Sequence, residues 1–365
     1  MTPLADLASP ALLVDTGRLD RNIADMAERM RGAGVALRPH VKTSKCLGVI
    51  RRQLAAGAAG ATCATPAEVR LLQDAGVADV LWAYQPVGPA TVAFTVAALR
   101  RGGLTVALDS YEAAEPLARA AADAGVRVPY LLECDTGLHR AGVDPDDAVR
   151  TAGRLAALPA LEPRGVLTHE GHVAQRAGRA AIEEAGTAAA ALLVQVAEAL
   201  RGAGHPCPVV SVGSTPGATS APYVPGVTEA RPGTYVYYDA NQVGLGGAEP
   251  GRCALTVLTR VISARRRGTA IIDAGLKAMS SDSLATAGGL GIVCDPYGAP
   301  AGDIAFGAAN EEHGYLTGDG AARLGVGDLL RVIPNHACGT TNMWSAVHPV
   351  TDMTAAPPWP ISARH

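Results

Sequence analysis

Between about residues 12 and 240, short apolar runs alternate with longer stretches that are rich in alanine and leucine. The short runs contain mostly valine, leucine and isoleucine and have the length of strands. The longer stretches carry spaced charges, and several begin at serine or proline and end at glycine, as helices do. Such alternation is typical of parallel strands covered by helices. The chain is therefore expected to have an α/β fold.

Eight strands are expected in this part of the chain, which favours a closed (β/α)8 barrel of the TIM type over an open sheet. The expected strands are 35–42, 61–65, 80–84, 104–109, 128–135, 165–169, 208–213 and 234–239. Expected helices include 44–56, 66–75, 89–101 and 111–124. The interval 214–233 is rich in proline and glycine and is interpreted as a loop.

After about Gly244 the pattern changes to strand-like runs with glycine and proline turns. These runs are 255–264, 269–272, 289–294, 326–333 and a segment around His336. They predict a second, mainly β domain of residues 246–365 after a barrel of residues 16–245. The apolar run 11–15 precedes the first barrel helix and is expected to pair with the second domain, which then also includes residues 1–15.

Composition excludes several classes of protein. Hydrophobic residues make up 48% of the 365 residues and the mean hydropathy is +0.16, which indicates a folded chain. A net charge of −3 and the absence of a basic stripe argue against nucleic-acid binding. No membrane helix or signal peptide is expected. Seven cysteines without a paired spacing do not suggest disulfides, so a reduced, cytoplasmic location is expected.

Active sites of parallel barrels lie where the strands end, so polar residues at those positions are candidates. They are His40, Lys42, Lys45, Thr65, Tyr84, Gln85, Asp109, Asp135, Arg140, His169, Glu170, His172 and the turn 213–217. Only three of the 31 basic residues are lysines, and two of these, Lys42 and Lys45, follow the first strand. Arginine cannot replace lysine as a nucleophilic amine because it stays protonated.

The turn Gly213-Ser-Thr-Pro-Gly217 can offer backbone N–H groups and hydroxyls to an anion, although many such sequences form only a turn. A phosphate site after the seventh and eighth strands recurs in barrels. An anchored phosphate together with a lysine amine at another strand end is what pyridoxal phosphate requires.

His336 and Cys338 are two residues apart and would project to the same side of an extended strand. Imidazole and thiolate are zinc ligands, and two protein ligands would leave positions open, as in a catalytic site. The alternative is a core histidine beside a buried cysteine. Glu312 and His313 are candidates for supporting residues or simply part of an exposed turn. The aspartates at 109, 239 and 273 are interpreted as structural.

Four segments occur in an order that resembles the D-threonine aldolase and D-serine dehydratase family of pyridoxal phosphate enzymes. They are Arg38-Pro-His-Val-Lys-Thr43, Gly213-Ser-Thr-Pro216, Arg231-Pro-Gly-Thr-Tyr235 and Asn335-His-Ala-Cys338. The resemblance spans essentially the whole chain. It implies a fold-type III enzyme with an alanine-racemase-like barrel and a C-terminal β domain, and typically a homodimer.

The resemblance also implies roles for individual residues. Lys42 would form the Schiff base with the cofactor, and Lys42 and His172 would be the catalytic residues. The phosphate would be held by Thr215, Gly233 and Thr234, and Arg140 would face the pyridine nitrogen. His336 and Cys338 would bind a divalent metal, for which zinc is expected and manganese or magnesium are alternatives.

Two positions depart from the family pattern. Ser44 stands where the family usually has histidine, and Val173-Ala174 stand where an aromatic residue often follows His172. These differences affect the expected contacts to the substrate and leave the residues that would anchor the cofactor unchanged.

The expected reaction acts on a small D-amino acid with a β-hydroxyl group. The family's dehydratases carry a His-x-Cys pair and its aldolases a His-x-Asp pair, so Cys338 favours elimination to a keto acid and ammonia. Retro-aldol cleavage to glycine and an aldehyde is the alternative. A racemase or a barrel that binds pyridoxal phosphate without turnover are further alternatives.

Overall fold

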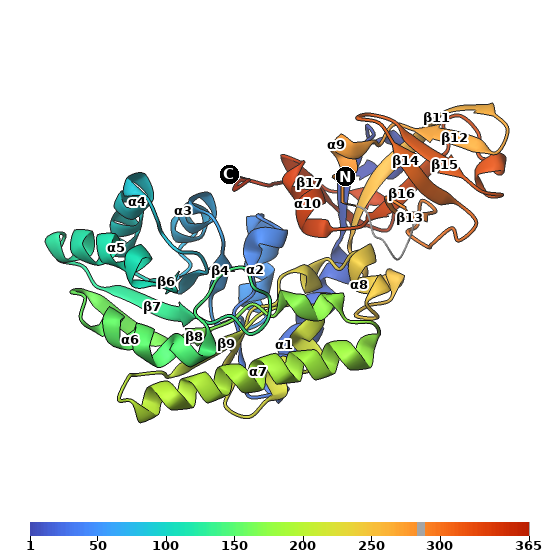
Figure 1. Cartoon of the computed structure of the whole chain (residues 1–365). Coiled ribbons are helices and arrows are strands. Elements are labelled where there is room, and N and C mark those ends of the chain that lie inside the picture. Colours follow the sequence, from blue (N-terminus) through green and yellow to red (C-terminus); the bar gives the residue numbers. More distant parts are fainter. Residues whose placement is uncertain (283–288, 365) are drawn as a thin grey trace. The chain divides into compact units, whose positions relative to one another are not determined.

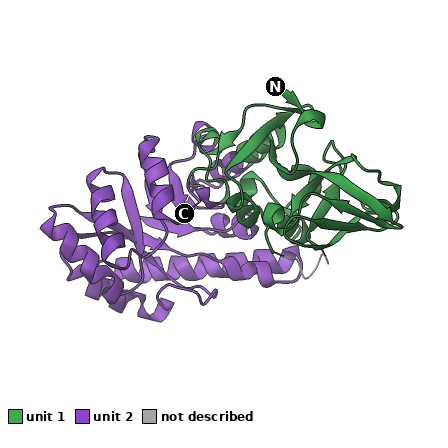
Figure 2. Ribbon diagram, turned by 90° about the horizontal axis from the view of Figure 1, so that it is seen from above, with its two compact units in different colours: residues 1–25, 43–52, 234–362 green, residues 26–42, 53–233, 363–365 purple. Residues whose placement is uncertain are grey.

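The computed structural model describes residues 1–282 and 289–364, and the chain divides into two compact units (Figure 2). The barrel unit comprises Met26–Lys42, Gln53–Gly233 and Ala363–His365. The β unit comprises Met1–Asp25, Thr43–Arg52 and Thr234–Ser362. Each unit contains its own sheet.

The barrel unit is built on an eight-stranded sheet in which every neighbouring pair is parallel. In sheet order the strands are β3 (Ala36–Leu37), β10 (Glu229–Ala230), β9 (Val209–Val212), β8 (Leu161–Leu167), β7 (Val128–Glu133), β6 (Leu104–Leu108), β5 (Val80–Trp82) and β4 (Ala61–Cys63). An isolated parallel bridge between His40 and Thr62 joins the two ends of this order. The predicted α/β barrel is thus confirmed.

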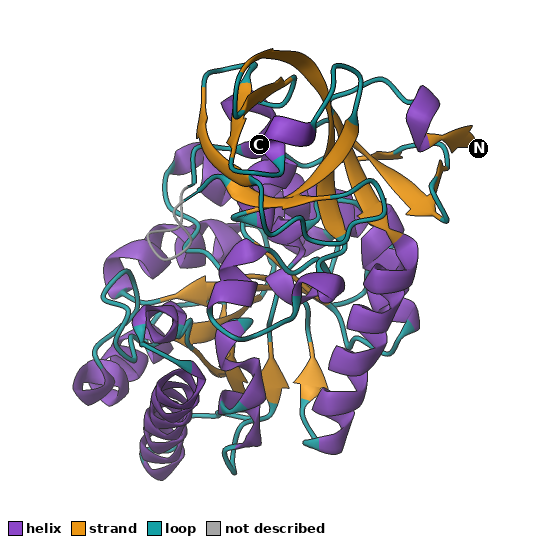
Figure 3. Ribbon diagram, turned by 90° about the vertical axis from the view of Figure 1, so that its right-hand side faces the viewer, coloured by secondary structure: helices purple, strands orange, loops and turns teal. Residues whose placement is uncertain are grey.

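Helices surround these strands (Figure 3). They are α3 (Pro66–Asp74), α4 (Pro89–Arg100), α5 (Tyr111–Asp123), α6 (Ala148–Ala156) and α7 (Arg179–Gly202). Two further helices, α1 (Thr16–Gly32) and α2 (Leu47–Ala55), are each divided between the two units. The start of α3 shows how the sequence sets an end. The Thr65 side chain accepts a hydrogen bond from the Glu68 N–H at 3.2 Å, and the Glu68 carboxylate accepts one from the Ala64 N–H at 2.6 Å. Pro66 begins the helix, where its missing N–H costs nothing.

In the described part of the chain, α7 is the one helix long and apolar enough to cross a membrane. It contacts β8 and β9 along the outside of the barrel (Figure 1). Its buried face includes Ile182, Leu193 and Leu200. We therefore interpret α7 as a covering helix of the barrel.

The prediction for the eighth strand was wrong. Residues 234–239 begin with a short 3-10 helix, Thr234–Val236, and the eighth strand is β10 in the segment interpreted as a loop. The run 234–239 is buried, and a fully buried run has no periodicity that separates strand from helix. β10 carries a buried charge, Glu229, which is matched by Arg38 with 2.7 Å between Nε and Oε2.

The β unit contains an eleven-stranded, mostly antiparallel sheet. Its strands are β1 (Thr2–Pro3), β2 (Ala11–Asp15), β11 (Leu255–Arg266), β12 (Thr269–Ile272), β13 (Gly291–Cys294), β14 (Ala305–Ala309), β15 (Gly314–Thr317), β16 (Leu329–Pro334), β17 (Ala346–Thr351), β18 (Thr354–Ala355) and β19 (Trp359–Pro360). Its short helices are α8 (Ala240–Gly244), α9 (Leu276–Met279) and α10 (Ala337–Asn342). The prediction that the run 11–15 joins this domain is confirmed, because β2 lies between β11 and β17.

A second prediction was wrong. His336 and Cys338 do not lie on a strand: β16 ends at Pro334, His336 caps α10, and Cys338 lies within this helix. A helix of six residues is too short to show a helical period in the sequence. The spacing of two therefore does not place the side chains on one face of a strand, and their proximity has to be shown directly.

Candidate active site

The carboxyl ends of the barrel strands form a single rim, because all eight strands are parallel. Lys42 follows β3, Arg140 follows β7, His172 follows β8, Thr215 follows β9 and Gly233 follows β10. Five predicted site residues of the barrel unit therefore share this rim. Thr234, His336 and Cys338 belong to the β unit.

Cations lie close to two histidines near Lys42. The half-buried imidazole of His40 accepts a hydrogen bond at Nδ1 from the Lys42 backbone N–H at 3.4 Å. Burial, followed by the charges of Lys42 and Arg231, holds the pKa of His40 well below its usual value. Burial and the charge of Lys42 also lower the pKa of His169 to about 3. Both imidazoles are neutral at pH 7, so the charge comes from the lysine and the arginines, an environment that suits an anionic cofactor.

The glycine turn after β9 is held by two residues that follow β8. Glu170 accepts hydrogen bonds from the Gly213 N–H at 2.9 Å and from the Ser214 hydroxyl at 3.0 Å. His169 Nδ1 donates to the Gly213 carbonyl, which fixes its tautomer. A side chain at 217 would place its Cβ 2.8 Å from Glu170 Oε1, so the turn requires glycine there. The turn is thus fixed before an anion binds, and Thr215 lies within it.

Arg231 lies beneath this turn. Its guanidinium donates to the Thr168 carbonyl at 2.6 Å and to the Ser211 hydroxyl, so it links the ends of β8 and β9. A Cβ on Gly213 would lie 3.1 Å from Arg231 Nη2. Glycine at 213 therefore lets the backbone pack directly on the guanidinium.

Arg140 and His172 lie on loops that face the same rim. The exposed Arg140 guanidinium is 3.7 Å from the carboxylate of Glu133, which is buried. His172 Nδ1 is buried and has no hydrogen-bond partner among the residues that the structure describes, and burial lowers the pKa of this imidazole. A Cβ on Gly137 would come within 3.1 Å of His172 Nε2, so glycine at 137 leaves space for the ring. A neutral, unpartnered imidazole fits a group that exchanges a proton with a ligand.

In the β unit, His336 and Cys338 face each other. A hydrogen bond from the imidazole to Cys338 raises the pKa of His336 to about 9. The other ring nitrogen, Nδ1, lies 2.9 Å from Asp282 Oδ2. Cys338 Sγ lies 3.2 Å from the Thr43 hydroxyl and 3.9 Å from the Thr234 hydroxyl. Imidazole nitrogen and thiol sulfur thus meet as they would around a shared zinc ion.

His336 and Cys338 would supply two protein ligands to a metal ion. Among the described residues, no group of three or more histidine, cysteine or acidic side chains is arranged to hold a metal. A metal here would keep open positions, as catalytic sites do. The residues present therefore fit a catalytic metal better than a structural one.

Sequence reasoning gave no role to Glu170, Thr43 or Asp282. Glu170 was a candidate by position, whereas nothing in the sequence relates residue 282 to residue 336.

Asp239 is structural, as expected. It is buried and accepts hydrogen bonds from the Gln242 and Ala337 N–H groups at 2.9 Å, and burial raises its pKa to about 6.

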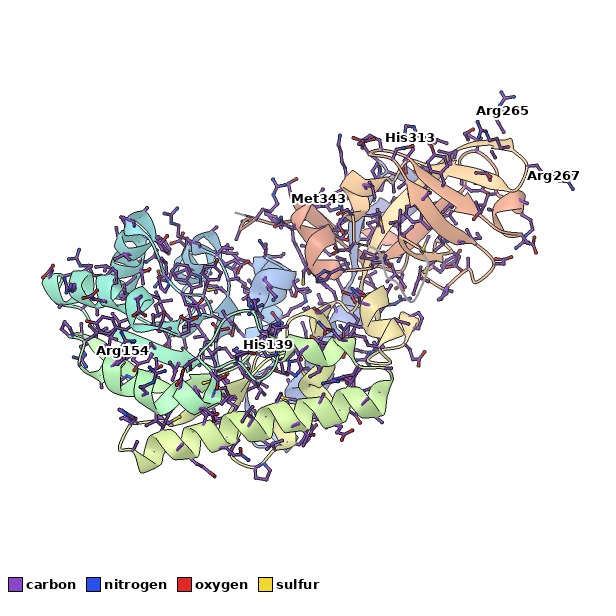
Figure 4. All side chains as sticks on the ribbon, in the orientation of Figure 1. His139, Arg154, Arg265, Arg267, His313 and Met343 are labelled. Atoms are coloured by element: carbon purple, nitrogen blue, oxygen red, sulfur yellow. The ribbon has the colours of Figure 1, made fainter. Side chains whose placement is uncertain are left out.

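Glu312 and His313 prove to be exposed turn residues, and Glu312 pairs with Lys277 at 2.7 Å. In Figure 4, His313 lies on the β unit, and His139 lies on the barrel unit in the loop after β7. The alternative interpretation of this cluster, an exposed turn, is the one that the structure supports.

Comparisons with known proteins agree with this arrangement. Residues 14–241 match the family model "Alanine racemase, N-terminal domain", and residues 254–350 match "Putative serine dehydratase domain". The chain is 41% identical to D-threo-3-hydroxyaspartate dehydratase of Delftia sp. strain HT23, over 92% of both chains. It is 30% identical to D-threonine aldolase of Arthrobacter sp., over 99% of this chain and 94% of that one.

The chain belongs to the D-threonine aldolase and D-serine dehydratase family. The solved structure of the Delftia dehydratase matches 99% of both chains with a TM-score of 0.93 at 38% identity. D-threonine aldolase from Filomicrobium marinum matches 100% of this chain and 97% of that chain with a TM-score of 0.91 at 28% identity. Membership in this family confirms the predicted class of enzyme, a lyase.

One prediction concerns the stability of the rim. His169 titrates near pH 3 in the folded chain and near its usual value of 6.5 when unfolded. Between these values the unfolded chain binds one more proton, so stability is complete above about pH 6.5 and falls as the pH decreases. For His169→Asn, whose amide can replace Nδ1 as donor, the slope of unfolding free energy against pH should be shallower by about 1.4 kcal/mol per pH unit. Denaturant titrations at pH 4 to 6 measure it, and equal slopes would contradict the assignment.

Proposed function

We propose that this chain is a pyridoxal phosphate- and metal-dependent dehydratase of β-hydroxy-D-amino acids, with D-threo-3-hydroxyaspartate as the first substrate to test. The product would be a keto acid, with release of ammonia. The observation that carries the proposal is the imidazole of His336 facing the thiol of Cys338. The 41% identity to a dehydratase of this substrate supports it.

The cofactor would be held by groups of the barrel rim and the residue that follows it. Lys42 would bind it covalently, and Thr215, Gly233 and Thr234 would hold its phosphate. Arg140 would face the ring nitrogen. When bound, pyridoxal phosphate supplies an electron sink for the negative charge that develops at the substrate Cα.

The chain's own groups would move the protons. The Lys42 amine would take the proton from Cα, and His172, whose pKa is lowered by burial, would accept or return a proton as a neutral base. The Arg140 guanidinium lies 3.7 Å from Glu133, and a guanidinium beside a ring nitrogen would oppose protonation of that nitrogen. The electron sink would then be weaker, and more of the activation would have to come from the metal.

His336 and Cys338 would hold the divalent metal, for which we propose zinc. Metal ions act as Lewis acids that stabilise a departing oxygen. Two solved variants of D-threo-3-hydroxyaspartate dehydratase support this assignment. One is substituted at a histidine and the other at a cysteine two positions later, and the cysteine variant is described as metal-free. The spacing is that of His336 and Cys338.

We also infer a homodimer in a reducing, cytoplasmic setting. All seven cysteines lie in the described part of the chain as thiols rather than disulfides, and six of them are buried. A chain with this pattern has no need of an oxidising compartment.

Product analysis tests the proposal. The purified chain should release ammonia and a keto acid from D-threo-3-hydroxyaspartate, more slowly from D-serine, and from neither L-enantiomer. A coupled assay that reduces the keto acid measures the rates. Glycine and an aldehyde in place of these products would identify the chain as an aldolase and would overturn the proposal.

A further inference from the structure

Asp282 binds His336 at Nδ1, the ring nitrogen that is not used for the hydrogen bond to Cys338. Nδ1 lies 2.9 Å from Asp282 Oδ2, and an ionised carboxylate can only accept, so Nδ1 carries the hydrogen and donates. This contact fixes Nδ1 as a donor, so Nε2, which donates to Cys338 here, is the nitrogen that would give up its hydrogen to bind a metal. Nε2 is the nitrogen left for Cys338 and for a metal.

Asp282 is itself held in place from the strand that leads to the metal pair. The Asn335 side-chain amide donates to the Asp282 carbonyl at 2.9 Å and to the Gly289 carbonyl at 2.8 Å. The Asp282 backbone N–H donates to the Ser280 hydroxyl at 3.4 Å. Asn335 is buried, so its amide is a fixed support. The residue before His336 thus positions the carboxylate that binds His336.

Gly339, three residues after His336, leaves room for the Asp282 carboxylate. A Cβ on Gly339 would lie 3.0 Å from Asp282 Oδ2, so a side chain there would press on the oxygen that accepts from His336. Gly339 is on α10, which ends before Met343, labelled in Figure 4. The segment Asn335-His-Ala-Cys-Gly339 therefore contains the ligands, the residue that supports Asp282 and the glycine that makes room for it.

The backbone between the two ligands is fixed as well. The Ala337 N–H donates to Asp239 Oδ2 at 2.9 Å, and Asp239 is buried. Asp239 thus fixes the main chain next to His336, and Asp282 fixes the His336 ring. Carboxylate–histidine contacts of this kind orient metal-binding imidazoles and increase their basicity, and their loss typically weakens metal binding by roughly 10–100-fold.

We propose that Asp282 is a positioning residue of the metal site, which sets the tautomer and the orientation of His336. The inference rests on the proposed function, because it requires His336 and Cys338 to hold a metal. The competing description is a half-exposed ion pair, of a kind that usually contributes little. Metal affinity separates the two, since an ordinary surface pair has no effect on it.

Cobalt(II) is the probe, because a thiolate bound to it gives an intense near-ultraviolet absorption. Cobalt titration of the metal-free protein, with a competing chelator, gives a dissociation constant for each variant. Asp282→Ala should bind cobalt roughly 10–100-fold more weakly than the unsubstituted protein and keep the thiolate band, because Cys338 is unchanged. Asp282→Asn keeps an acceptor oxygen and should lose less. Asp319→Ala, a change at an exposed aspartate of the same unit, should bind as the unsubstituted protein does.

Each outcome has one meaning. Equal affinities for Asp282→Ala and the unsubstituted protein would overturn the proposal while leaving the metal site intact. A changed spectrum of the cobalt bound to Asp282→Ala would make Asp282 a ligand and would also overturn it. An unsubstituted protein without the thiolate band would overturn the metal site and this inference together. Thermal unfolding of the metal-free variants confirms that the exposed substitutions leave the fold unchanged.

Discussion

Lys42→Ala should abolish both the yellow colour of the purified protein and its turnover. The colour arises from the bond between the lysine amine and the cofactor aldehyde, and arginine or alanine cannot form it. Loss of the same amine as a base should lower kcat by roughly 10²–10⁴-fold, even if added cofactor still binds. An absorption spectrum and a turnover assay measure the two effects.

Two further variants make this result specific. Lys42→Arg keeps the positive charge in the rim but not the nucleophile, so it should be as colourless as Lys42→Ala. Lys277→Ala removes an exposed lysine that pairs with Glu312, and it should keep both colour and turnover. A yellow Lys42→Ala protein would show that the cofactor is bound elsewhere, and the assignment of the rim would be wrong.

Removing the metal should stop turnover without removing the cofactor. Chelation, or the substitution Cys338→Ala, takes away the Lewis acid that assists departure of the hydroxyl group. Such assistance supplies several kcal/mol, so the rate should fall by at least ~100-fold. The yellow colour should persist, because neither treatment changes the residues that would anchor the cofactor, which are Lys42, Thr215, Gly233 and Thr234. Parallel measurements of metal content, absorption and rate test this.

The matched control is His313→Ala, which removes an exposed histidine of the same unit that lies in the turn before β15. It should retain metal, colour and rate. Adding zinc back to the chelated protein should restore the rate, whereas Cys338→Ala should not recover. Undiminished turnover after complete removal of metal would exclude His336 and Cys338 from the reaction.

The barrel was predictable because its signal is distributed over many residues. Alternating runs mark most strands and helices by length and composition, and parallel strands must bring their polar ends to one rim. The rim residues Lys42, Arg140, His172 and Thr215 could therefore be located without coordinates. Two-residue strands such as β10 lack such a signal, because pairing with β3 and β9 and the contact of Glu229 with Arg38 form only in the folded chain.

The metal pair shows a different limit. The sequence offered His336 and Cys338 as candidate ligands, but the element that carries them is a capped helix of six residues rather than a strand. Their supports are separated in sequence: Asp282 is 54 residues from His336, and Thr43 is 295 residues from Cys338. A single sequence contains no local pattern that relates positions so far apart, so contacts of this kind require the structure.

The most direct test of the proposed dehydration is a carbon and nitrogen balance on D-threo-3-hydroxyaspartate. The purified protein, supplied with pyridoxal phosphate and zinc, is incubated with this compound, and all products are quantified in the same sample. The account predicts equal amounts of oxaloacetate and ammonia, with no glycine. Equal amounts of glycine and glyoxylate, without ammonia, would contradict it.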